Sequence, residues 1–496
     1  MKALHIYNSF TKEKEEFKSI NPDKVGMYVC GPTVYGHPHL GHARSAITFD
    51  IVFRYLSYLG YKVRYVRNIT DVGHLEDEVA GTGEDKIAKK ARLEQLEPME
   101  VAQTYTNSYH SAMDQLQVLR PSIEPLATGH IPEQIKAIEN AIEAGFAYEK
   151  NGSVYFNLEK FAQEKEYGGL SGKVLEDLQV GSRDTEGLDE KDHPHDFALW
   201  KKADPKHIMK WESPWGLGFP GWHIECTAMS YKYLGFPFDI HGGGMDLQFP
   251  HHEAEIAQGQ ACFHEAPANY WMHNNMLTIN GQKMAKSKGN FINLEEMLTG
   301  SHDLLEQAYT PMTIRFFMLQ ANYRSTVDFS NEALQAAEKG FQKLMKSIKS
   351  LKKLSLQKTK NLDESLNESV HKLMSQFEDE MNDDFNTAKA IAVLFELSSY
   401  IFQFDNKQLA WNSLSKETQE NLIEKYPVYI EEVLGLKAEE EGSGDRLDAL
   451  VKLFIDQRKD ARVAKDFALS DKIRDDLAAL GIVLKDGKEG TSYELE

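Results

Sequence analysis

The chain has 496 residues, enough for two to four domains, and a formal net charge of −20. This acidic balance argues against bulk electrostatic binding to nucleic acid, although a local basic patch remains compatible with such a partner. Three cysteines are too few for a disulfide framework and indicate a reducing, cytoplasmic compartment. The N-terminus lacks a basic segment followed by an apolar stretch, and no run of about eighteen apolar residues occurs, so we expect neither a signal peptide nor a membrane span.

The N-terminal part of the chain predicts the start of a parallel sheet. Residues 25–30 form an apolar run typical of a buried strand, and a turn-rich stretch follows. From about Leu40, apolar residues recur at helical spacing as far as Gly60, and residues 61–67 alternate like a second strand. A strand–helix–strand unit of this kind predicts an α/β fold with a parallel sheet.

The composition of the rest of the chain changes several times. Charged, turn-rich segments such as 181–192 indicate an insertion, and residues 236–241 predict a later strand that ends in three glycines. Long, glycine-poor helices are expected after about residue 327, and residues 438–446 are expected to be a linker. Beyond the linker we expect helices near 447–464 and 470–480 and a turn-rich tail. These changes predict a division of the chain into six regions, residues 1–120, 121–220, 221–270, 271–326, 327–437 and 438–496.

One of the predicted helices has a basic face. Its lysines recur every three or four residues, with Phe341, Leu344, Ile348 and Leu351 between them. The pattern fits either a solvated face or a face that contacts RNA. The lysines are Lys339, Lys343, Lys346, Lys349, Lys352 and Lys353.

Two cysteines, a histidine and a glutamate suggest a metal site. Cys30 ends the first predicted strand, and Cys226 lies in a distant segment. His251 and Glu255 follow Pro250 and lie four residues apart, so on a helix they share a face. A set of two thiolates, an imidazole and a carboxylate suits zinc. Two buried cysteines and a histidine at a helix start are the alternative reading of the same spacing.

Three further segments suggest nucleotide handling. His39-Leu-Gly-His42 lies where a strand leads into a helix, whose N-terminus attracts phosphate, and Gly41 allows close approach of the backbone. The loop that contains Lys283, Lys286 and Ser287 could clamp a triphosphate. Gly244 and Asp246 follow a predicted strand and could hold a ribose. Each segment alone could equally be an ordinary surface loop or turn.

The order of these segments is that of the class I aminoacyl-tRNA synthetases. From about residue 20 to the C-terminus, the chain resembles the cysteinyl-tRNA synthetases. The strings that carry this resemblance are Tyr28-Val-Cys-Gly-Pro-Thr-Val-Tyr, Asn68-Ile-Thr-Asp, Asp196-Phe-Ala-Leu-Trp-Lys, Pro220-Gly-Trp-His-Ile-Glu-Cys and Phe249-Pro-His-His-Glu.

The resemblance implies a Rossmann-like catalytic domain with a connective insertion (121–220), a helical bundle and a C-terminal anticodon-binding module. It implies one Zn²⁺ per chain, held by Cys30, Cys226, His251 and Glu255, with His252 as the rival imidazole. The implied substrates are L-cysteine, ATP with Mg²⁺ and the tRNA for cysteine, and relatives are mostly monomers. The activity implied is ligation of cysteine to the 3′ end of this tRNA through cysteinyl-adenylate.

The resemblance also assigns individual roles. Thr70 and Trp222 would line the cysteine pocket, and Gly244 and Asp246 would hold the adenosine. The remaining residues belong to the two phosphate motifs, in which Lys286 would stabilise the α-phosphate as pyrophosphate leaves. They are His39, Gly41, His42, Lys283, Lys286 and Ser287.

The chain departs from the family pattern in a few places. Ala254, Ala285 and Tyr493 stand where relatives usually have asparagine, serine and tryptophan, and the insertion after Asp71 is longer. Two alternatives stay open: a tRNA-independent ligase that joins cysteine to an amino sugar, and a paralogue that binds without catalysis. The chain keeps the C-terminal region that the amino-sugar ligase lacks, including Arg458, Arg462 and Arg474, which favours the synthetase.

Overall fold

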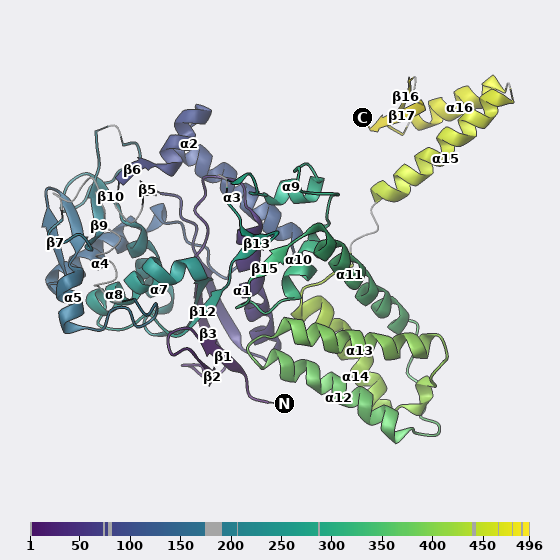
Figure 1. Cartoon of the computed structure of the whole chain (residues 1–496), viewed down its shortest axis with the longest axis horizontal. Coiled ribbons are helices and arrows are strands. Elements are labelled where there is room, and N and C mark those ends of the chain that lie inside the picture. The colour runs from purple at the N-terminus through teal and green to yellow at the C-terminus, as the bar shows by residue number, and fades with distance from the viewer. Residues whose placement is uncertain are drawn as a thin grey trace. The chain divides into compact units, whose positions relative to one another are not determined.

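The computed structural model describes most of the chain as two compact units, Met1–Lys437 and Ala438–Glu496 (Figure 1). The described residues are 2–72, 75–77, 82–173, 191–205, 207–285, 288–438, 443–464, 466–478, 480–487 and 490–495.

The first unit is built on a four-stranded sheet whose strands are all parallel, in the order β12-β11-β3-β4. The helix α1 (Leu40–Tyr58) connects the two strands that the N-terminal sequence predicted, and the predicted α/β class is confirmed. Parallel strands place their carboxyl ends at one edge, so Val29, Arg67, Gly244 and Asn274 end together there. The strands are β3 (Lys24–Val29), β4 (Lys62–Arg67), β11 (Phe238–Gly244) and β12 (Ala268–Asn274).

The strand β11 differs from its prediction. It begins at Phe238 instead of residue 236 and continues through the glycines that were expected to follow it. A side chain at Gly242 would place its Cβ 2.2 Å from the ring of Phe49, which α1 packs against the sheet. Glycine is needed at this position because the sheet and α1 meet there too closely for a side chain.

The insertion forms a second layer with a hydrophobic core of its own. Its antiparallel sheet has the order β10-β9-β8-β7, and the helix α4 (Ile131–Glu143) packs with it. The same core includes residues of α7 (Trp222–Leu234) and α8 (Glu253–Cys262), so the insertion supports two helices of the catalytic region. Of the segment 181–192, residues 181–190 lie outside the described residues. The remaining elements are β7 (Ala147–Lys150), β8 (Ser153–Phe156), α5 (Leu158–Glu164), β9 (Phe197–Lys202) and β10 (Gly218–Pro220).

Shorter elements surround the parallel sheet. A hairpin precedes it, the segment after Asp71 adds two short strands and two helices, and a small sheet of order β14-β13-β15 follows β12. These elements are β1 (His5–Asn8), β2 (Glu13–Glu16), β5 (Leu75–Asp77), β6 (Thr82–Asp85), α2 (Lys86–Glu94), α3 (Pro98–Gln115), β13 (Leu277–Ile279), β14 (Gln282–Lys283), α9 (Leu294–Thr299), α10 (Pro311–Leu319) and β15 (Val327–Phe329).

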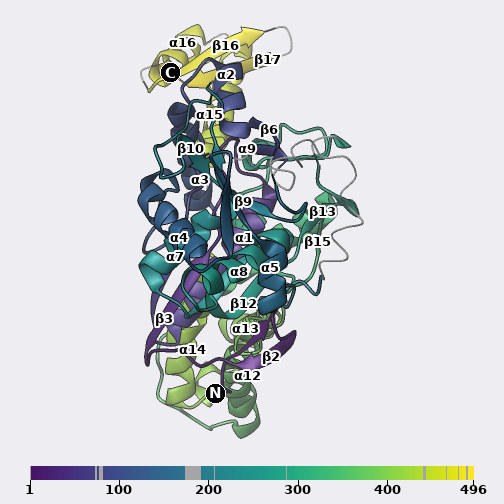
Figure 2. The ribbon, with the colours of Figure 1, turned by 90° about the vertical axis from the view of Figure 1, so that its left-hand side faces the viewer.

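A helical bundle completes the first unit and confirms the long helices expected after residue 327. Within this unit, the parallel sheet lies between the insertion and the bundle (Figures 1 and 2). The bundle helices are α11 (Asn331–Leu351), α12 (Glu364–Met381), α13 (Thr387–Asp405) and α14 (Lys416–Val428), which continues into η7 (Tyr429–Val433).

A buried carboxylate joins α1 to the bundle. Asp50 accepts hydrogen bonds from Arg54 Nε at 2.7 Å, from the backbone N–H of Leu119 at 2.8 Å, and from Arg315 on α10. Arg315 also donates to the carbonyl oxygens of Leu116 at 3.0 Å and Leu434 at 2.8 Å. These contacts tie α1, α3, α10 and the end of η7 together through one charged cluster.

The second unit is a pair of helices with a hairpin. The helix α15 starts at Ser443, inside the expected linker, while residues 439–442 lie outside the described residues. The tail after α16, which was expected to be turn-rich, forms a hairpin: β16 and β17 pair in antiparallel fashion, with Leu484 opposite Tyr493. The elements are α15 (Ser443–Val463), α16 (Phe467–Ala478), β16 (Ile482–Gly487) and β17 (Gly490–Leu495).

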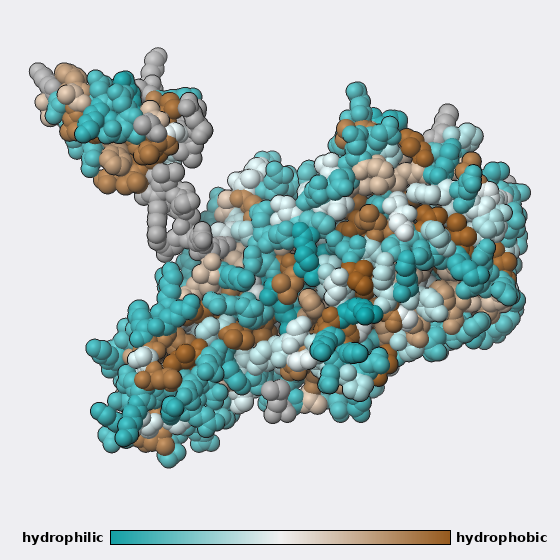
Figure 3. Space-filling model, turned by 180° about the vertical axis from the view of Figure 1, so that it is seen from behind, coloured by the Kyte–Doolittle hydropathy of each residue, from teal (hydrophilic) through white to brown (hydrophobic). Residues whose placement is uncertain are grey.

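The surface gives no indication of a membrane span. Over the described residues, no helix combines the length and the apolar character that crossing a bilayer requires. The face drawn in Figure 3 is mainly hydrophilic, with apolar residues in separate patches.

We expect Arg315→Ala to destabilise the first unit strongly. The substitution leaves Asp50 buried without one of its two cations, and removing one partner of a buried ion pair costs about 3–5 kcal/mol, or roughly 3–5 °C in the unfolding midpoint of a unit of this size. Calorimetry measures this shift. Arg120→Ala, which removes an exposed pair with Asp114, is the matched control and should shift the midpoint far less. Equal shifts in both variants would contradict the structural importance of the Asp50 cluster.

Candidate active site

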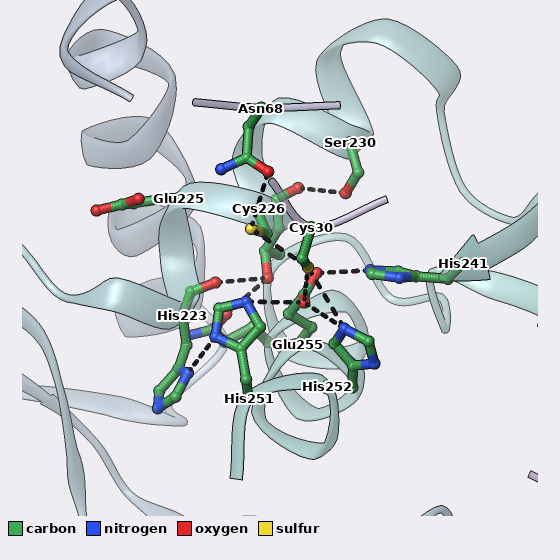
Figure 4. Close-up of polar contacts among 12 residues, drawn as sticks. Cys30, Asn68, His223, Glu225, Cys226, Ser230, His241, His251, His252 and Glu255 are labelled. Carbon is green, nitrogen blue, oxygen red and sulfur yellow. Dashed lines mark hydrogen bonds and ion pairs between the residues drawn. The ribbon is translucent and has the colours of Figure 1, made fainter. Parts of the chain in front are cut away.

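The four predicted metal ligands meet beside the carboxyl edge of the parallel sheet (Figure 4). Cys30 follows β3, Cys226 lies in α7, His251 precedes α8 and Glu255 lies within it. One donor atom from each lies within 4.8 Å of all the others. The sulfur atoms of Cys30 and Cys226 are 3.7 Å apart, and His251 Nε2 is 3.2 Å from Glu255 Oε1.

Close approach of the backbone makes this cluster possible. Gly31, next to Cys30, passes the segment after β4 so closely that a Cβ would lie 1.6 Å from the carbonyl oxygen of Asn68. The end of β3 can therefore lie directly against the end of β4 only with glycine at this position. His251 and Glu255 lie four residues apart and share a face, as the sequence predicted, and both side chains point to Cys30 and Cys226.

A second donor set overlaps the first. Cys30 and Glu255 also lie within 4.8 Å of His241 and His252, which replace Cys226 and His251 in this set. His252 Nε2 is 3.4 Å from Cys30 Sγ, and His241 Nε2 is 2.9 Å from Glu255 Oε2. The structure thus brings the predicted ligands together, and it also brings together the rival His252 and an additional histidine, His241.

Burial dominates the electrostatics of the pocket. Burial raises the pKa of the Cys30 thiol well above its ordinary value, and burial also raises the pKa of Cys226. Burial, and then the neighbouring His241, lowers the pKa of His252, so this imidazole is neutral. A divalent cation would stabilise the thiolates that burial disfavours, and the mixed sulfur, nitrogen and oxygen set fits zinc.

Behind the cluster, a buried hydrogen-bond chain fixes Thr70. Its hydroxyl donates to Glu225 Oε2 at 3.0 Å and accepts from Asn68 Nδ2 at 3.0 Å. Asn68 Oδ1 accepts from the backbone N–H of Gly31 at 2.9 Å and lies 3.7 Å from Cys226 Sγ. Within the described part of the chain, the Thr70 oxygen accepts one hydrogen bond and has a second lone pair, so a ligand in the pocket would find an acceptor at a fixed place.

An aromatic ring lies over the other side of the cluster. The half-buried Trp222 lies with its ring centroid 4.2 Å from that of His251, whose Nδ1 is 2.9 Å from His223 Nδ1. The two predicted pocket residues, Thr70 and Trp222, therefore both border the donor cluster. This supports their assignment to one pocket, although it identifies no substrate.

His39 and His42 cap the N-terminus of α1. His39 Nδ1 accepts from the backbone N–H of Gly41 at 3.0 Å, and His42 Nδ1 accepts from the backbone N–H of His39 at 3.2 Å. The two rings stack with centroids 3.8 Å apart. Because each Nδ1 is an acceptor, the neutral rings carry their proton on Nε2. Burial and then His39 lower the pKa of His42, which keeps that ring neutral.

This capping changes how a phosphate would be held. The helix N-terminus was expected to present free backbone N–H groups, but the N–H of Gly41 is already bonded to an imidazole. The donors that the motif offers are therefore the Nε2–H groups of the two histidines. Two such groups can donate to phosphate oxygens.

The remaining nucleotide residues lie at the same edge or on the loop beyond it. Gly244 ends β11, and the exposed Asp246 lies in the short 3₁₀ turn (Met245–Leu247) that follows. Lys283 is exposed at the end of β14, and Lys286 and Ser287 lie outside the described residues.

The base of the Lys283 loop is closed by a residue that the sequence did not single out. Asn290 Oδ1 accepts from the backbone N–H of Ala285 at 2.8 Å, and its Nδ2 donates to the carbonyl oxygen of Lys283 at 3.2 Å. Because Asn290 is buried and bonds to two residues at the start of the loop, it joins the end of the loop to its beginning. Its place three residues after Ser287, at the end of this loop, was the signal that could have identified it.

Sequence reasoning also missed the polar residues that surround the metal ligands. Asn68 lies two residues before the predicted Thr70 and directly after the buried strand β4, where a polar residue can indicate a role in a site. Glu225 directly precedes the predicted Cys226. His223, His241 and His273 come from separate segments, and nothing in their spacing relates them. His273 Nε2 is 2.8 Å from His252 Nδ1, and burial lowers the pKa of His273 to about 3.

Two family models match the chain. The model described as "tRNA synthetases class I (C) catalytic domain" matches residues 16–339, which include the sheet, the insertion and the donor cluster. The model described as "DALR domain" matches residues 376–438, within the helical bundle.

Full-length relatives carry a single name. Proteins named "Cysteine--tRNA ligase" are 56% identical in Bacteroides fragilis, 54% in Porphyromonas gingivalis and 50% in Chlorobaculum tepidum, each with 99% of both chains covered.

Among solved structures, the similarity lies in the fold. A Mycobacterium tuberculosis methionyl-tRNA synthetase bound by methionyl-adenylate has a TM-score of 0.59 at 13% identity, covering 83% of this chain and 92% of that one. A putative arginyl-tRNA synthetase from Campylobacter jejuni has a TM-score of 0.52 at 14% identity, covering 84% and 94%.

Replacing a cysteine of the cluster should remove the metal, and the chain offers a matched control. Cys226 belongs only to the first donor set, whereas Cys262 is equally buried in α8 and belongs to neither set. We expect Cys226→Ala to lose most of its zinc and Cys262→Ala to keep it, as measured by elemental analysis of purified protein. Full zinc in Cys226→Ala, together with loss in His252→Ala, would instead assign the metal to the second set.

Proposed function

The chain belongs to the cysteine–tRNA ligase family of class I aminoacyl-tRNA synthetases, and from that premise we propose that it joins L-cysteine to the 3′ end of the tRNA for cysteine. It is an enzyme of the ligase class. The observation that carries the proposal is the cluster of two thiols, an imidazole and a carboxylate at the strand ends, beside Thr70 and Trp222.

The proposed reaction has two steps. The carboxylate of cysteine attacks the α-phosphate of ATP-Mg²⁺, giving cysteinyl-adenylate and releasing pyrophosphate. A hydroxyl of the terminal adenosine of the tRNA then attacks the acyl carbonyl, and AMP leaves. No protein nucleophile takes part, so the protein contributes through positioning and stabilisation of charge.

The described residues suggest a division of labour. The Nε2–H groups of His39 and His42 would donate to phosphate oxygens at the start of α1, and Asp246 would accept from ribose hydroxyls at the end of β11. Thr70, held by Asn68 and Glu225, would accept a hydrogen bond from the ammonium group of cysteine. Asn290 would hold the loop whose Lys286 would stabilise the α-phosphate as pyrophosphate leaves.

The proposed metal is one zinc ion, bound by Cys30, Cys226, His251 and Glu255. When bound, zinc would ligate the thiolate of the substrate and distinguish it from the hydroxyl of serine. Hydrophobic contacts alone do not give selection of ~10⁴–10⁵ between such similar side chains. A site that selects by a soft ligand therefore suits a chain in which no editing domain is evident from the sequence.

The alternative, an amino-sugar ligase, gains no support from the comparisons. The relatives that cover 99% of the chain bear the tRNA ligase name, and their match includes the C-terminal unit. A cytoplasmic location and a monomeric state stay predictions, as does the role of the C-terminal unit in reading the anticodon.

Removing the C-terminal unit tests the proposal. The intact chain should show cysteine-dependent ATP–pyrophosphate exchange and should charge total tRNA with cysteine. A chain that ends at Lys437 keeps the first compact unit, so its exchange should survive while charging falls steeply. Exchange without any charging by the intact protein would contradict the synthetase assignment, and equal charging by the shortened chain would contradict the anticodon role.

We expect Lys286→Ala to slow adenylate formation about 10²–10³-fold, because one charge-stabilising donor is lost. Pyrophosphate exchange measures the rate, and zinc content should not change. Lys288→Ala, two residues further along the same loop, is the control and should have a much smaller effect. An exchange rate equal to that of the unaltered protein would exclude Lys286 from the phosphate site.

A further inference from the structure

A buried glutamate lies midway between two of the proposed metal ligands, His251 and Glu255, and belongs to neither donor set. It is Glu253, the first residue of α8. Its carboxylate accepts two backbone hydrogen bonds, from the N–H of Gly168 at 3.0 Å and from the N–H of Ser171 at 2.8 Å. Both donors belong to the loop that follows α5 in the insertion, so Glu253 joins the start of α8 to that loop.

The same loop contacts the turn between β11 and α8 at further points. We call residues 165–173 the α5 loop. Gln248 Nε2 donates to the carbonyl oxygen of Leu170 at 2.8 Å, and Lys173 Nζ lies 3.9 Å from the ring centroid of Phe249. Leu170 is itself buried in the core of the parallel sheet. The helices α5 and α8 share the core of the insertion and lie side by side (Figures 1 and 2), so the α5 loop is held at its start as well.

The turn that the α5 loop contacts joins the nucleotide side of the site to the metal side. Asp246 lies in the 3₁₀ turn after β11, and His251 lies in the π turn that follows, five residues further along. The contacts of the α5 loop are made with residues 248, 249 and 253, between these two positions and just beyond them. A shift of this turn would therefore change the separation between Asp246 and the metal ligand.

The two ends of the turn differ in what else holds them. His251 Nδ1 lies 2.9 Å from His223 Nδ1, and the ring centroid of His251 lies 4.2 Å from that of Trp222. Asp246, in contrast, is exposed. Loss of the contacts with the α5 loop should accordingly displace Asp246 more than His251.

We propose that Glu253 is a positioning residue that, through the α5 loop, sets the place of the adenosine of ATP relative to the metal site. The proposal rests on the proposed function, because adenylate formation requires the carboxylate of cysteine to reach the α-phosphate. Such an attack needs the reacting atoms about 3–3.5 Å apart, and a misplacement of about 1 Å can cost roughly 10²-fold in rate. Glu253 acts on this distance through Asp246, which would accept from the ribose hydroxyls.

Glu253→Gln in the full chain tests this role with little change of shape. The amide oxygen can still accept one hydrogen bond, but the NH₂ group then faces a backbone N–H, so one contact is lost. We expect the KM for ATP in cysteine-dependent pyrophosphate exchange, and the Kd for ATP-Mg²⁺ alone, to rise about 10-fold or more. The KM for cysteine and the zinc content should change by less than about twofold, because the ligands keep their own contacts.

Asp239 offers a matched control on the strand that leads to the turn. It is buried near the start of β11 and accepts from the backbone N–H of Ile20 at 2.7 Å and from that of Gly26 at 2.7 Å. These two bonds repeat those of Glu253 at the opposite edge of the sheet, away from the carboxyl ends of the strands. Asp239→Asn should therefore lower the unfolding midpoint as Glu253→Gln does, and it should leave the KM and the Kd for ATP unchanged.

A raised KM and Kd for ATP in Glu253→Gln alone, with zinc and cysteine affinity retained, supports the proposal. Equal values for ATP in both variants would overturn it, as would a loss of zinc or of cysteine affinity in Glu253→Gln that matches or exceeds the loss of ATP affinity. If Glu253→Gln does not fold, Gln248→Ala removes the contact with Leu170 from a half-buried position and is judged by the same criterion. Failure of the unaltered protein to show cysteine-dependent exchange would refute the proposed function, and the Kd for ATP alone would still decide the role of Glu253.

Discussion

The carboxylate of Asp50 is the constraint on which the arrangement of the first unit depends. It lies in the middle of α1 and accepts from two buried arginines, which in turn donate to backbone carbonyls of the segment after α3 and of the end of the bundle. A buried charge of this kind is stable only while all of its partners are in place. The helix that begins with His39 and His42 is therefore held at its centre against three other parts of the chain. Further along α1, the hydroxyl of Tyr58 donates to Glu378 of α12 at 2.6 Å, which adds a second attachment to the bundle.

The donor cluster has a different kind of support, because α7 and α8 each belong to two layers. Cys226 packs with the core of the parallel sheet, whereas Ile224 and Ala228 of the same helix belong to the core of the insertion. Ala257 and Ala261 of α8 likewise face the insertion, while Glu255 faces the cluster. The insertion thus determines how far apart the donors lie. The same burial that fixes them raises the pKa of both thiols, so rigidity and the need for a cation have one cause.

Local patterns in the sequence predicted the parts of this arrangement that depend on local physics. The spacing of apolar residues gave α1, and the i,i+4 relation gave the shared direction of His251 and Glu255. Features that depend on distant residues could not be predicted. The glycines of β11 belong to the strand because they pair with Met272, His273 and Asn274 of β12. His241 lies 2.9 Å from Glu255 because the side chains of β11 and α8 meet there. The final hairpin was missed because its pairing is set by contacts between two short segments of mixed composition. The roles of Lys286 and Ser287 still rest on the family resemblance, since these residues lie outside the described part of the chain.

The wide separation of the metal ligands along the chain has a consequence for biosynthesis. Cys30 and Cys226 are 196 residues apart, and Glu255 follows later still. At a synthesis rate of roughly 5–20 residues per second, Cys30 is made about 10–40 s before Cys226. Throughout that interval Cys30 is a single thiol without fellow ligands, so it can neither bind a metal tightly nor pair with a neighbouring cysteine. If these residues bind the proposed zinc ion, its capture would be a late event in the life of the nascent chain, after the whole insertion has been synthesised and α8 has folded against it.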